Sequence, residues 1–272
     1  MKTITIAGAK GGTGKTTTAI AVSYELARAG YRVTIADCDP QAMATQGLRQ
    51  SPTDAPLATE PTQLEFDFRS SWNGRSTGAL HLARGGRSLA TASRADVGDH
   101  LRRLATAVDF LVVDTSATMA PPLLAAIEAA DLIVVSLHAA PYCLSGLRDM
   151  LQTVTQINAS ARIRALLTQV KGRRRMVEYI ATAVEARYPA LLYETRVPDD
   201  AQCESASGEC VPVGRFDARS RAAVAYHTLA HAMRSDLGLP VFDRLIDWEA
   251  TRKRSMAKAQ SAPSTNGVAH AS

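Results

Sequence analysis

The sequence predicts an α/β fold with a doubly wound, mostly parallel sheet that carries helices on both faces. Strand-like and helix-like stretches alternate along most of the chain. The 272 residues are also 46% hydrophobic and 21% charged, which is enough apolar material for a large core. We expect one domain over residues 1–240 with an irregular insertion at about 50–94. A tail at 241–272 is expected to lose order beyond about residue 256.

The first strand and helix enclose a glycine-rich loop. Residues 3–7 are rich in β-branched side chains, and apolar residues have helical spacing over 18–28. Backbone amides of such a loop, at a helix N-terminus, attract phosphate. We predict that Lys15 binds the β and γ phosphates of a nucleoside triphosphate and that Thr16 binds Mg²⁺. The predicted nucleotide-binding residues of the loop are Gly11, Gly12, Thr13, Gly14, Lys15, Thr16 and Thr17.

A dinucleotide-binding loop is the alternative interpretation of the same stretch. Asp37 lies roughly 20 residues further on, where such proteins carry a ribose-binding carboxylate. Lys15 and Thr16 argue against this alternative, because a dinucleotide loop has no use for a lysine directed at a terminal phosphate.

The second strand, at residues 33–37, ends in two carboxylates. Asp37 and Asp39 are two residues apart, so in an extended chain both point to one face at the carboxyl edge of the sheet. Ligands bind at that edge in open α/β sheets. Cys38 points the other way and is expected in the core. A solvated turn at the strand end is the alternative.

A third buried strand, at residues 108–115, contains Asp114 near its end. Mg²⁺ binds one or two carboxylates and keeps several waters, so we predict that Asp114 is a metal ligand opposite Thr16. Further strands are predicted at 130–138 and 162–169, with two more in the insertion at 64–68 and 79–83. Helices are expected from about 175 and over about 217–233, where apolar residues recur at helical spacing.

Lys-Gly-Gly-Thr-Gly-Lys-Thr-Thr at residues 10–17 resembles the deviant Walker A motif of the ParA/MinD family of ATPases. Ala9 stands where the common motif has its first glycine. Matching segments follow at 37–41, 142–147 and 192–200, so the resemblance extends from Met1 to about Leu237. Only residues 48–95 lack a specific match, and residues 115–122 depart from the family's D-x-P-P pattern.

The resemblance implies a P-loop ATPase that uses ATP and Mg²⁺ and hydrolyses ATP slowly until a partner stimulates it. It implies that Lys10 reaches across a homodimer to the nucleotide of the partner subunit. Lys10 and Lys15 would both act as catalytic cations, and Asp39 would position the attacking water. Asp37 would lie near the metal or act structurally. The loop at Pro198 and Asp199 would pack on adenine. The implied partners are a second copy of the chain on ATP binding and a ParB-like activator.

Excess positive charge favours a polyanionic partner, since the formal net charge is +5. The densest basic cluster is at residues 171–175, and an ordinary solvated basic face is the alternative explanation. Because the resemblance implies DNA binding without sequence preference, Arg173, Arg174 and Arg175 are the candidates for that contact. Acidic Asp199 and Glu209 stand at places where many relatives are basic.

Three other functions share this fold. A ParA-like positioner of a protein cargo would use the same chemistry. A MinD-like membrane protein would need a C-terminal amphipathic helix, and residues 241–248 offer only a short apolar stripe interrupted by acidic side chains. An iron-sulfur carrier would need more than Cys143 near the dimer axis.

The expected location is cytoplasmic and nucleoid-associated. The sequence has no apolar run of the ~20 residues that a membrane span needs and no signal-peptide pattern. The four cysteines have no C-x-x-C spacing and are expected to be reduced. With a first strand starting at Lys2, no N-terminal helix-turn-helix and no operator-specific repression are expected.

Overall fold

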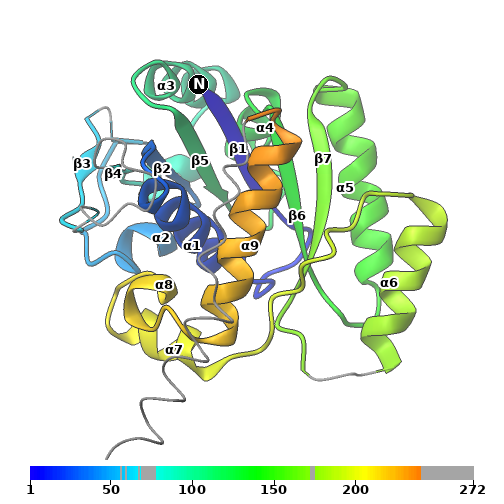
Figure 1. Cartoon of the computed structure of the whole chain (residues 1–272). Helices are drawn as coiled ribbons and strands as arrows, with labels where there is room; N and C mark the ends of the chain where they lie inside the picture. Colours follow the sequence, from blue (N-terminus) through cyan, green and yellow to red (C-terminus); the bar gives the residue numbers. More distant parts are fainter. Residues whose placement is uncertain (56, 59, 67, 69–77, 172–174, 240–272) are drawn as a thin grey trace, which may run out of the picture. The chain divides into compact units, whose positions relative to one another are not determined.

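The computed structural model describes residues 1–239 except 56, 59, 67, 69–77 and 172–174. The described strands form one sheet in the order β3-β4-β2-β5-β1-β6-β7 (Figure 1). Its pairings are parallel except that between β3 and β4. The predicted doubly wound, mostly parallel sheet is therefore confirmed. The strands are β1 (Lys2–Ala7), β2 (Arg32–Cys38), β3 (Thr62–Gln63), β4 (Ala79–Ala83), β5 (Phe110–Thr115), β6 (Leu132–His138) and β7 (Arg162–Thr168).

Helices cover both faces of the sheet, because successive strand side chains point to opposite sides. Val33 and Ile35 of β2 belong to the core shared with α1 and α9, which lie in front of the sheet in Figure 1. Ala36 and Cys38 belong to the core beneath α3. The helices are α1 (Lys15–Arg28), α2 (Met43–Gln46), α3 (Arg94–Thr106), α4 (Pro121–Glu128), α5 (Cys143–Ile157), α6 (Arg175–Arg187), α7 (Ala201–Gly208), α8 (Val213–Phe216) and α9 (Arg221–Asp236), with a 3-10 turn η1 (Arg87–Ala90).

The insertion contributes β3 and β4, the two strands at one edge of the sheet. The strand predicted at 79–83 is confirmed as β4, but the strand predicted at 64–68 is wrong, because the ladder with β4 ends at Gln63. Phe66 and Phe68 instead pack on Tyr24 of α1, with ring centroids 5.7 and 5.6 Å away. Every second residue of this segment is apolar because those side chains pack on α1, and the resulting pattern has the same period as a strand.

The segment at 192–200, which resembles the family, forms no regular strand. It runs beside β7 with two isolated bridges, from Ala165 to Leu192 and from Val170 to Pro198. The tail predicted at 241–272 lies outside the described residues.

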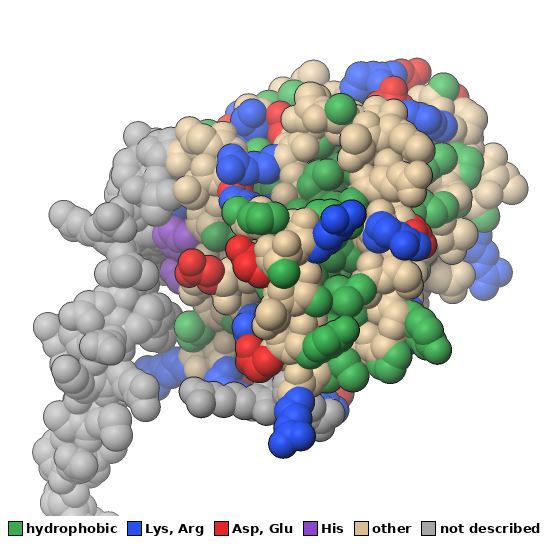
Figure 2. Space-filling model, turned by 90° about the vertical axis from the view of Figure 1, so that its right-hand side faces the viewer, with side chains coloured by type: hydrophobic (Ala, Val, Ile, Leu, Met, Phe, Trp, Pro, Cys, Tyr) green, Lys and Arg blue, Asp and Glu red, His purple; other side chains and the backbone are tan. Residues whose placement is uncertain are grey.

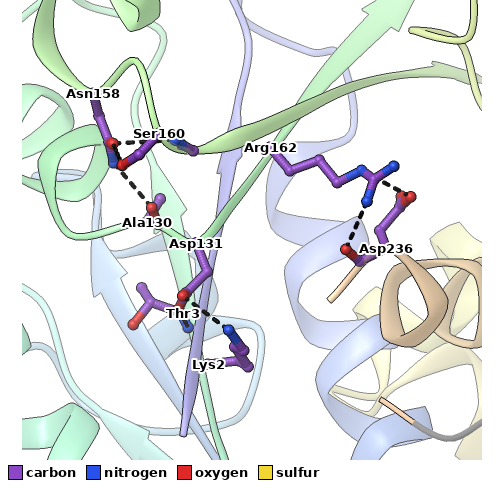
Figure 3. A network of polar contacts seen from close by, with 9 residues as sticks. Lys2, Thr3, Ala130, Asp131, Asn158, Ser160, Arg162 and Asp236 are labelled. Atoms are coloured by element: carbon purple, nitrogen blue, oxygen red, sulfur yellow. Dashed lines mark hydrogen bonds and ion pairs between the residues drawn. The ribbon is translucent and has the colours of Figure 1, made fainter. Parts of the chain in front are cut away.

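Polar contacts fix the edge of the sheet where the strands begin (Figure 3). Asp131 accepts a hydrogen bond from the Thr3 amide at 2.8 Å and pairs with Lys2 at 3.2 Å. Asp236, the last residue of α9, pairs with Arg162 at 3.2 Å. It also pairs with Arg164 at 2.6 Å and accepts a hydrogen bond from the Tyr193 hydroxyl at 2.9 Å. These contacts hold α9 against β7 at the edge opposite to the glycine loop.

A buried polar cluster joins α1 to α9. His227 Nδ1 lies 2.8 Å from Oε2 of Glu25, and Arg28 pairs with the same carboxylate at 3.2 Å. The rings of His227 and His231 are 4.7 Å apart. Burial, together with the charges of His227 and Arg234, lowers the pKa of His231 from 6.5 to about 4.

His231 should make the fold sensitive to acid. The unfolded chain takes up this proton near pH 6.5 and the folded chain only near pH 4, so the free energy of unfolding should fall as the pH drops through that window. The His231→Gln variant is expected to lose part of this decrease. Urea denaturation of both proteins across the window measures the difference, and identical pH profiles would contradict the prediction.

Candidate nucleotide-binding site

The glycine loop joins β1 to α1 at the carboxyl edge of the sheet. Gly12 and Gly14 have φ values of 74° and 75°, in the left-handed region that favours glycine. A Cβ on Gly11 or Gly12 would meet nothing within 4 Å, so the outer side of the loop is bare backbone. The loop residues 11–17 and Asp39 line one cleft of about 710 Å³. The structure thus brings together the predicted loop and the predicted catalytic carboxylate.

The two lysines of the loop face different cavities. Lys15 is only 8% exposed and lines the 710 Å³ cleft, where its Nζ donates a hydrogen bond to the Lys10 carbonyl at 3.2 Å. Burial lowers the Lys15 pKa, while Asp114 and Asp39 act to raise it. Lys10 is exposed and lines a neighbouring cavity of about 570 Å³ beside α5. Its ammonium forms no ion pair with any residue that the structure describes.

Asp37 is fully buried, and both its carboxylate oxygens accept hydrogen bonds. Oδ2 accepts from the amide and the hydroxyl of Thr45, each at 2.7 Å, and Oδ1 from the amide of Asp39 at 3.2 Å. Burial raises its pKa to about 6, against the effect of these bonds. The Thr45 hydroxyl also accepts from the Gly85 amide at 3.1 Å. These contacts favour the structural role over metal binding, because the oxygens already hold the loop at 39–45.

Gly85 brings the insertion against this strand end. A Cβ at this position would lie 2.2 Å from the carbonyl oxygen of Asp37, so no larger residue fits without a backbone shift. Sequence reasoning missed both Thr45 and Gly85, since neither stands in a motif and the insertion has no recognisable match.

Asp39 lies on the wall of the 710 Å³ cleft with one oxygen engaged. Its Oδ1 accepts from the Gln41 amide at 2.9 Å, in a short turn that fixes the side chain. Oδ2 has no hydrogen bond to the part of the chain that is described. Asp39 also acts electrostatically on Lys15. One carboxylate oxygen therefore remains available to a group bound in the cleft.

Asp114 is suited to a metal ion. It is fully buried, and neither carboxylate oxygen has a hydrogen-bond partner. Burial and the charge of Asp37 raise its pKa; the Thr16 hydroxyl, which is near the carboxylate but outside ordinary hydrogen-bond geometry, acts to lower it. Buried acceptors without a donor cost free energy, and a divalent cation would offset that cost.

The described residues contain no group of three or more His, Cys, Asp or Glu side chains that could hold a metal. Mg²⁺ does not need one, because it takes one or two carboxylates and completes its shell with water and phosphate oxygens. Asp114 and Thr16 therefore fit a magnesium ion that arrives with a nucleotide.

Two residues at the end of β7 fix the glycine loop, and sequence reasoning missed both. Thr168 Oγ1 donates to the Thr13 carbonyl and Gln169 Nε2 to the Gly12 carbonyl, each at 2.8 Å. A Cβ on Gly146 of α5 would lie 2.8 Å from Cβ of Ala9, so α5 packs tightly on the other side of the loop. Their position could have indicated this role, because Thr168 and Gln169 stand at the end of a parallel strand and so lie at the same edge of the sheet as the loop.

Pro198 and Asp199 lie next to β7, outside the described wall of the 710 Å³ cleft. Pro198 bridges to Val170, and Asp199 pairs with Lys171 at 3.0 Å. A separate cavity of about 330 Å³, which shares Thr16, Thr17 and Met43 with the cleft, extends to Cys203 of α7. The adenine contact of Pro198 and Asp199 remains a prediction.

The predicted DNA-binding arginines are only partly placed. Arg173 and Arg174 fall outside the described residues, and Arg175 begins α6. Two neighbouring basic side chains are paired with carboxylates: Arg196 pairs with Glu178 at 2.7 Å, and Lys171 pairs with Asp199 at 3.0 Å. Figure 2 looks onto the side of the molecule formed by α5 and α6, where basic, acidic and hydrophobic side chains are interspersed. Of the helices that the structure describes, none is long and apolar enough to cross a bilayer.

Comparison with known proteins agrees with this geometry. The model of the CobQ/CobB/MinD/ParA nucleotide binding domain matches residues 4–213. The chromosome-partitioning ATPase Soj of Thermus thermophilus is 28% identical over 248 residues, which cover 85% of this chain and 94% of Soj. The sporulation initiation inhibitor protein Soj of Bacillus subtilis is 26% identical over 244 residues, covering 84% and 96%.

Solved structures with the same fold include nucleotide complexes. The septum site-determining protein MinD of Pyrococcus horikoshii with Mg-ADP superposes with a TM-score of 0.70 and 19% identity, covering 90% of this chain and 97% of MinD. An ATP complex of McdA from Cyanothece gives a TM-score of 0.72 at 17% identity, covering 88% and 97%. The glycine loop, the carboxylates at the strand ends and the match over residues 4–213 lead to one conclusion: the chain belongs to the CobQ/CobB/MinD/ParA family of nucleotide-binding proteins.

Proposed function

We propose that the chain is a ParA-type ATPase that works as an ATP-dependent dimer switch. It binds DNA without sequence preference and partitions or positions plasmid or chromosomal DNA with a ParB-like activator, in the cytoplasm and on the nucleoid. The opposed lysines of the glycine loop support this proposal best, because Lys15 lies in the nucleotide cleft while the ammonium of Lys10 forms no ion pair in its own subunit with the described residues. The similarity to Soj over 85% of the chain supports the partition role.

Each residue of the cleft has a defined task in this mechanism. The amides of residues 11–14 and the ammonium of Lys15 bind the phosphates. Thr16 and Asp114 hold Mg²⁺, which supplies positive charge against the negative charge that develops on the phosphates. Asp39 orients the attacking water with Oδ2, the oxygen that has no hydrogen bond. Asp37 keeps Asp39 in place, because it accepts hydrogen bonds from the amides of Asp39 and Thr45.

Large apolar side chains around the cleft support a closed dimer. Met43, Met119 and Tyr142 are 52%, 44% and 88% exposed. Met43 lines the nucleotide cleft, and the other two line the cavity that holds Lys10. Exposed apolar groups that gather at one edge favour contact with another protein surface. A second copy of the chain would cover them as Lys10 reaches its nucleotide, and hydrolysis would separate the two copies.

Reversing Arg173, Arg174 and Arg175 to glutamate tests the DNA-binding part of the proposal. We expect the triple variant to lose ATP-dependent retardation of a DNA fragment and to remain dimeric with ATP. Each phosphate contact that is lost should lower the slope of log affinity against log salt by about 1, so the slope should fall by about 3.

The matched control reverses three exposed arginines of η1 and α3, Arg87, Arg94 and Arg102, and should bind DNA nearly as well as the parent protein. Equal losses in both triple variants would show that only net charge matters. ATP-dependent pelleting with liposomes in place of DNA would favour the MinD-like alternative. A dimer that binds neither DNA nor liposomes would favour a protein cargo.

A further inference from the structure

The insertion at 48–95 reaches the nucleotide cleft, although it has no specific match to the ParA family. Ala90, the last residue of η1, lines the 710 Å³ cleft together with Asp39. Gly85, shortly after β4, lies against the end of β2, because a Cβ at this position would be 2.2 Å from the carbonyl oxygen of Asp37. A part of the chain outside the ATPase motifs therefore contacts the segment that carries the proposed catalytic carboxylate.

The start of the insertion holds Gly85 from its other side. The Thr53 amide donates to the Gly85 carbonyl at 3.0 Å, and Leu57 forms an isolated antiparallel bridge with Gly85. The neighbouring Gly86 is packed as closely, since a Cβ there would lie 1.9 Å from the carbonyl oxygen of Thr53. Leu57 itself is fully buried in the apolar core beneath α3. The position of Gly85 is thus set by the insertion on one side and by the end of β2 on the other.

Thr45 joins Gly85 to Asp37. Its hydroxyl accepts a hydrogen bond from the Gly85 amide at 3.1 Å and donates one to Oδ2 of Asp37 at 2.7 Å. A hydroxyl can accept and donate at the same time, whereas an aliphatic side chain of the same shape can do neither. Thr45 is fully buried, so solvent does not share these bonds. The insertion and the end of β2 are therefore connected through one buried hydroxyl.

The loop between Asp37 and Thr45 depends on such contacts. Ala42 has a φ of 52°, a left-handed conformation that is unfavourable for a residue with a side chain. Conformations of this kind persist where the surrounding structure holds them. Asp37 binds both ends of the loop, because it accepts from the amides of Asp39 and Thr45. The Ala42 amide donates to the Asp39 carbonyl at 2.8 Å, so the unfavourable residue and the carboxylate in the cleft belong to one turn.

We propose that Thr45 is a positioning residue for ATP hydrolysis and that its hydroxyl couples the insertion to Asp39. With the hydroxyl in place, Gly85 and Asp37 hold the loop in the conformation that puts the Asp39 carboxylate on the wall of the cleft. Without it, the Asp37 carboxylate loses a donor and the Gly85 amide loses its acceptor. The inference rests on the proposed function, in which Asp39 orients the attacking water. A displacement of about 1 Å in a catalytic site can lower the rate by about 100-fold.

Thr45→Val tests the coupling, because valine keeps the shape of the side chain and removes its hydroxyl. In single-turnover hydrolysis of Mg-ATP by the full chain, we expect the rate constant to fall by about tenfold or more. The Kd for Mg-ATP should change by less than about twofold, since an effect on the chemical step alone leaves binding intact. Thr45→Ser retains the hydroxyl and should restore most of the rate.

Thr5→Val is the matched control. Thr5 is also fully buried, and its hydroxyl donates to the Ala126 carbonyl at 2.7 Å. The substitution removes the same group from the same sheet without touching the Asp39 loop. It should hydrolyse ATP at the parental rate, even if it lowers the free energy of unfolding as Thr45→Val does.

Amide hydrogen exchange followed by NMR gives a second readout that needs no turnover. In Thr45→Val, the amides of Gly85 and Asp39 should exchange at least about tenfold faster relative to the amide of Val134, because local opening adds to global unfolding. Val134 is a fully buried residue of β6 and reports the global contribution. In Thr5→Val both ratios should equal those of the parent protein.

The proposal is overturned if Thr45→Val hydrolyses ATP at the parental rate, if Thr5→Val slows hydrolysis as much, or if Thr45→Ser restores nothing. Unchanged exchange at Gly85 and Asp39 in Thr45→Val would also overturn it. A parent protein that binds Mg-ATP and never hydrolyses it would refute the proposed function instead. In that case the exchange ratios would still decide whether Thr45 couples the insertion to the loop.

Discussion

Replacing Lys15 with alanine is expected to weaken ATP binding by about 100-fold or more. The ammonium of Lys15 is buried in the cleft, and burial lowers its pKa, so it meets bound phosphate in a setting where water screens the attraction little. Losing one partner of a buried charge pair costs about 2–5 kcal/mol, and each 1.4 kcal/mol is a factor of ten in affinity. Isothermal titration with Mg-ATP measures the loss directly.

Three further variants test whether the loss of ATP binding comes from the charge of Lys15 and is specific to this residue. Lys15→Met keeps the length and apolar stem of the side chain and should fail equally, which would assign the effect to the charge. Lys2→Ala removes a lysine that pairs with Asp131 at the opposite edge of the sheet and should bind ATP normally. Asp39→Ala should retain ATP binding and stop hydrolysis. Loss of ATP binding in Asp39→Ala to the same extent as in Lys15→Ala would contradict the separate roles.

The parts of the site that follow one another in sequence could be predicted. The glycine loop needs a strand before it and a helix after it, and both signals lie within the first 28 residues. Asp37, Asp39 and Asp114 could be located because strands that run parallel bring their carboxyl ends to one edge. The register partnership of Asp37 with Asp114 shows this principle at work.

The contacts that hold the site in place could not be predicted, because they join segments far apart in the chain. Thr168 and Gln169 bind carbonyls of the loop more than 150 residues earlier, at separations of 155 and 157. The proposed division of roles between Asp37 and Asp39 rests on the hydrogen bonds that Thr45 donates to Asp37, and nothing in the sequence distinguishes Thr45 from any other threonine. The false strand at 64–68 arose because packing on one helix gave the same alternation as a strand.

Replacing Lys10 with alanine is expected to abolish ATP-dependent dimerisation and to leave ATP binding by each subunit largely intact. Lys10 lines the cavity beside α5, whereas the nucleotide cleft is lined by the loop from Gly11 onward. Within its own subunit the described contacts of Lys10 come from its backbone carbonyl, which accepts from Thr13 and Lys15. Alanine preserves that carbonyl, so the loop and the position of Lys15 should not change.

Two-fold symmetry magnifies this effect. In a symmetric dimer each substitution is present on both sides of the interface, so a loss of about 2 kcal/mol per lysine becomes about 4 kcal/mol, or roughly 1,000-fold in the dimerisation constant. Light scattering with ATP, in the Asp39→Ala background to prevent turnover, separates dimer from monomer. Asp39→Ala alone should be dimeric and Lys10→Ala/Asp39→Ala monomeric at the same concentration. A double variant that remains dimeric would place the contacts that close the dimer elsewhere, with Met43, Met119 and Tyr142 as the next side chains to replace.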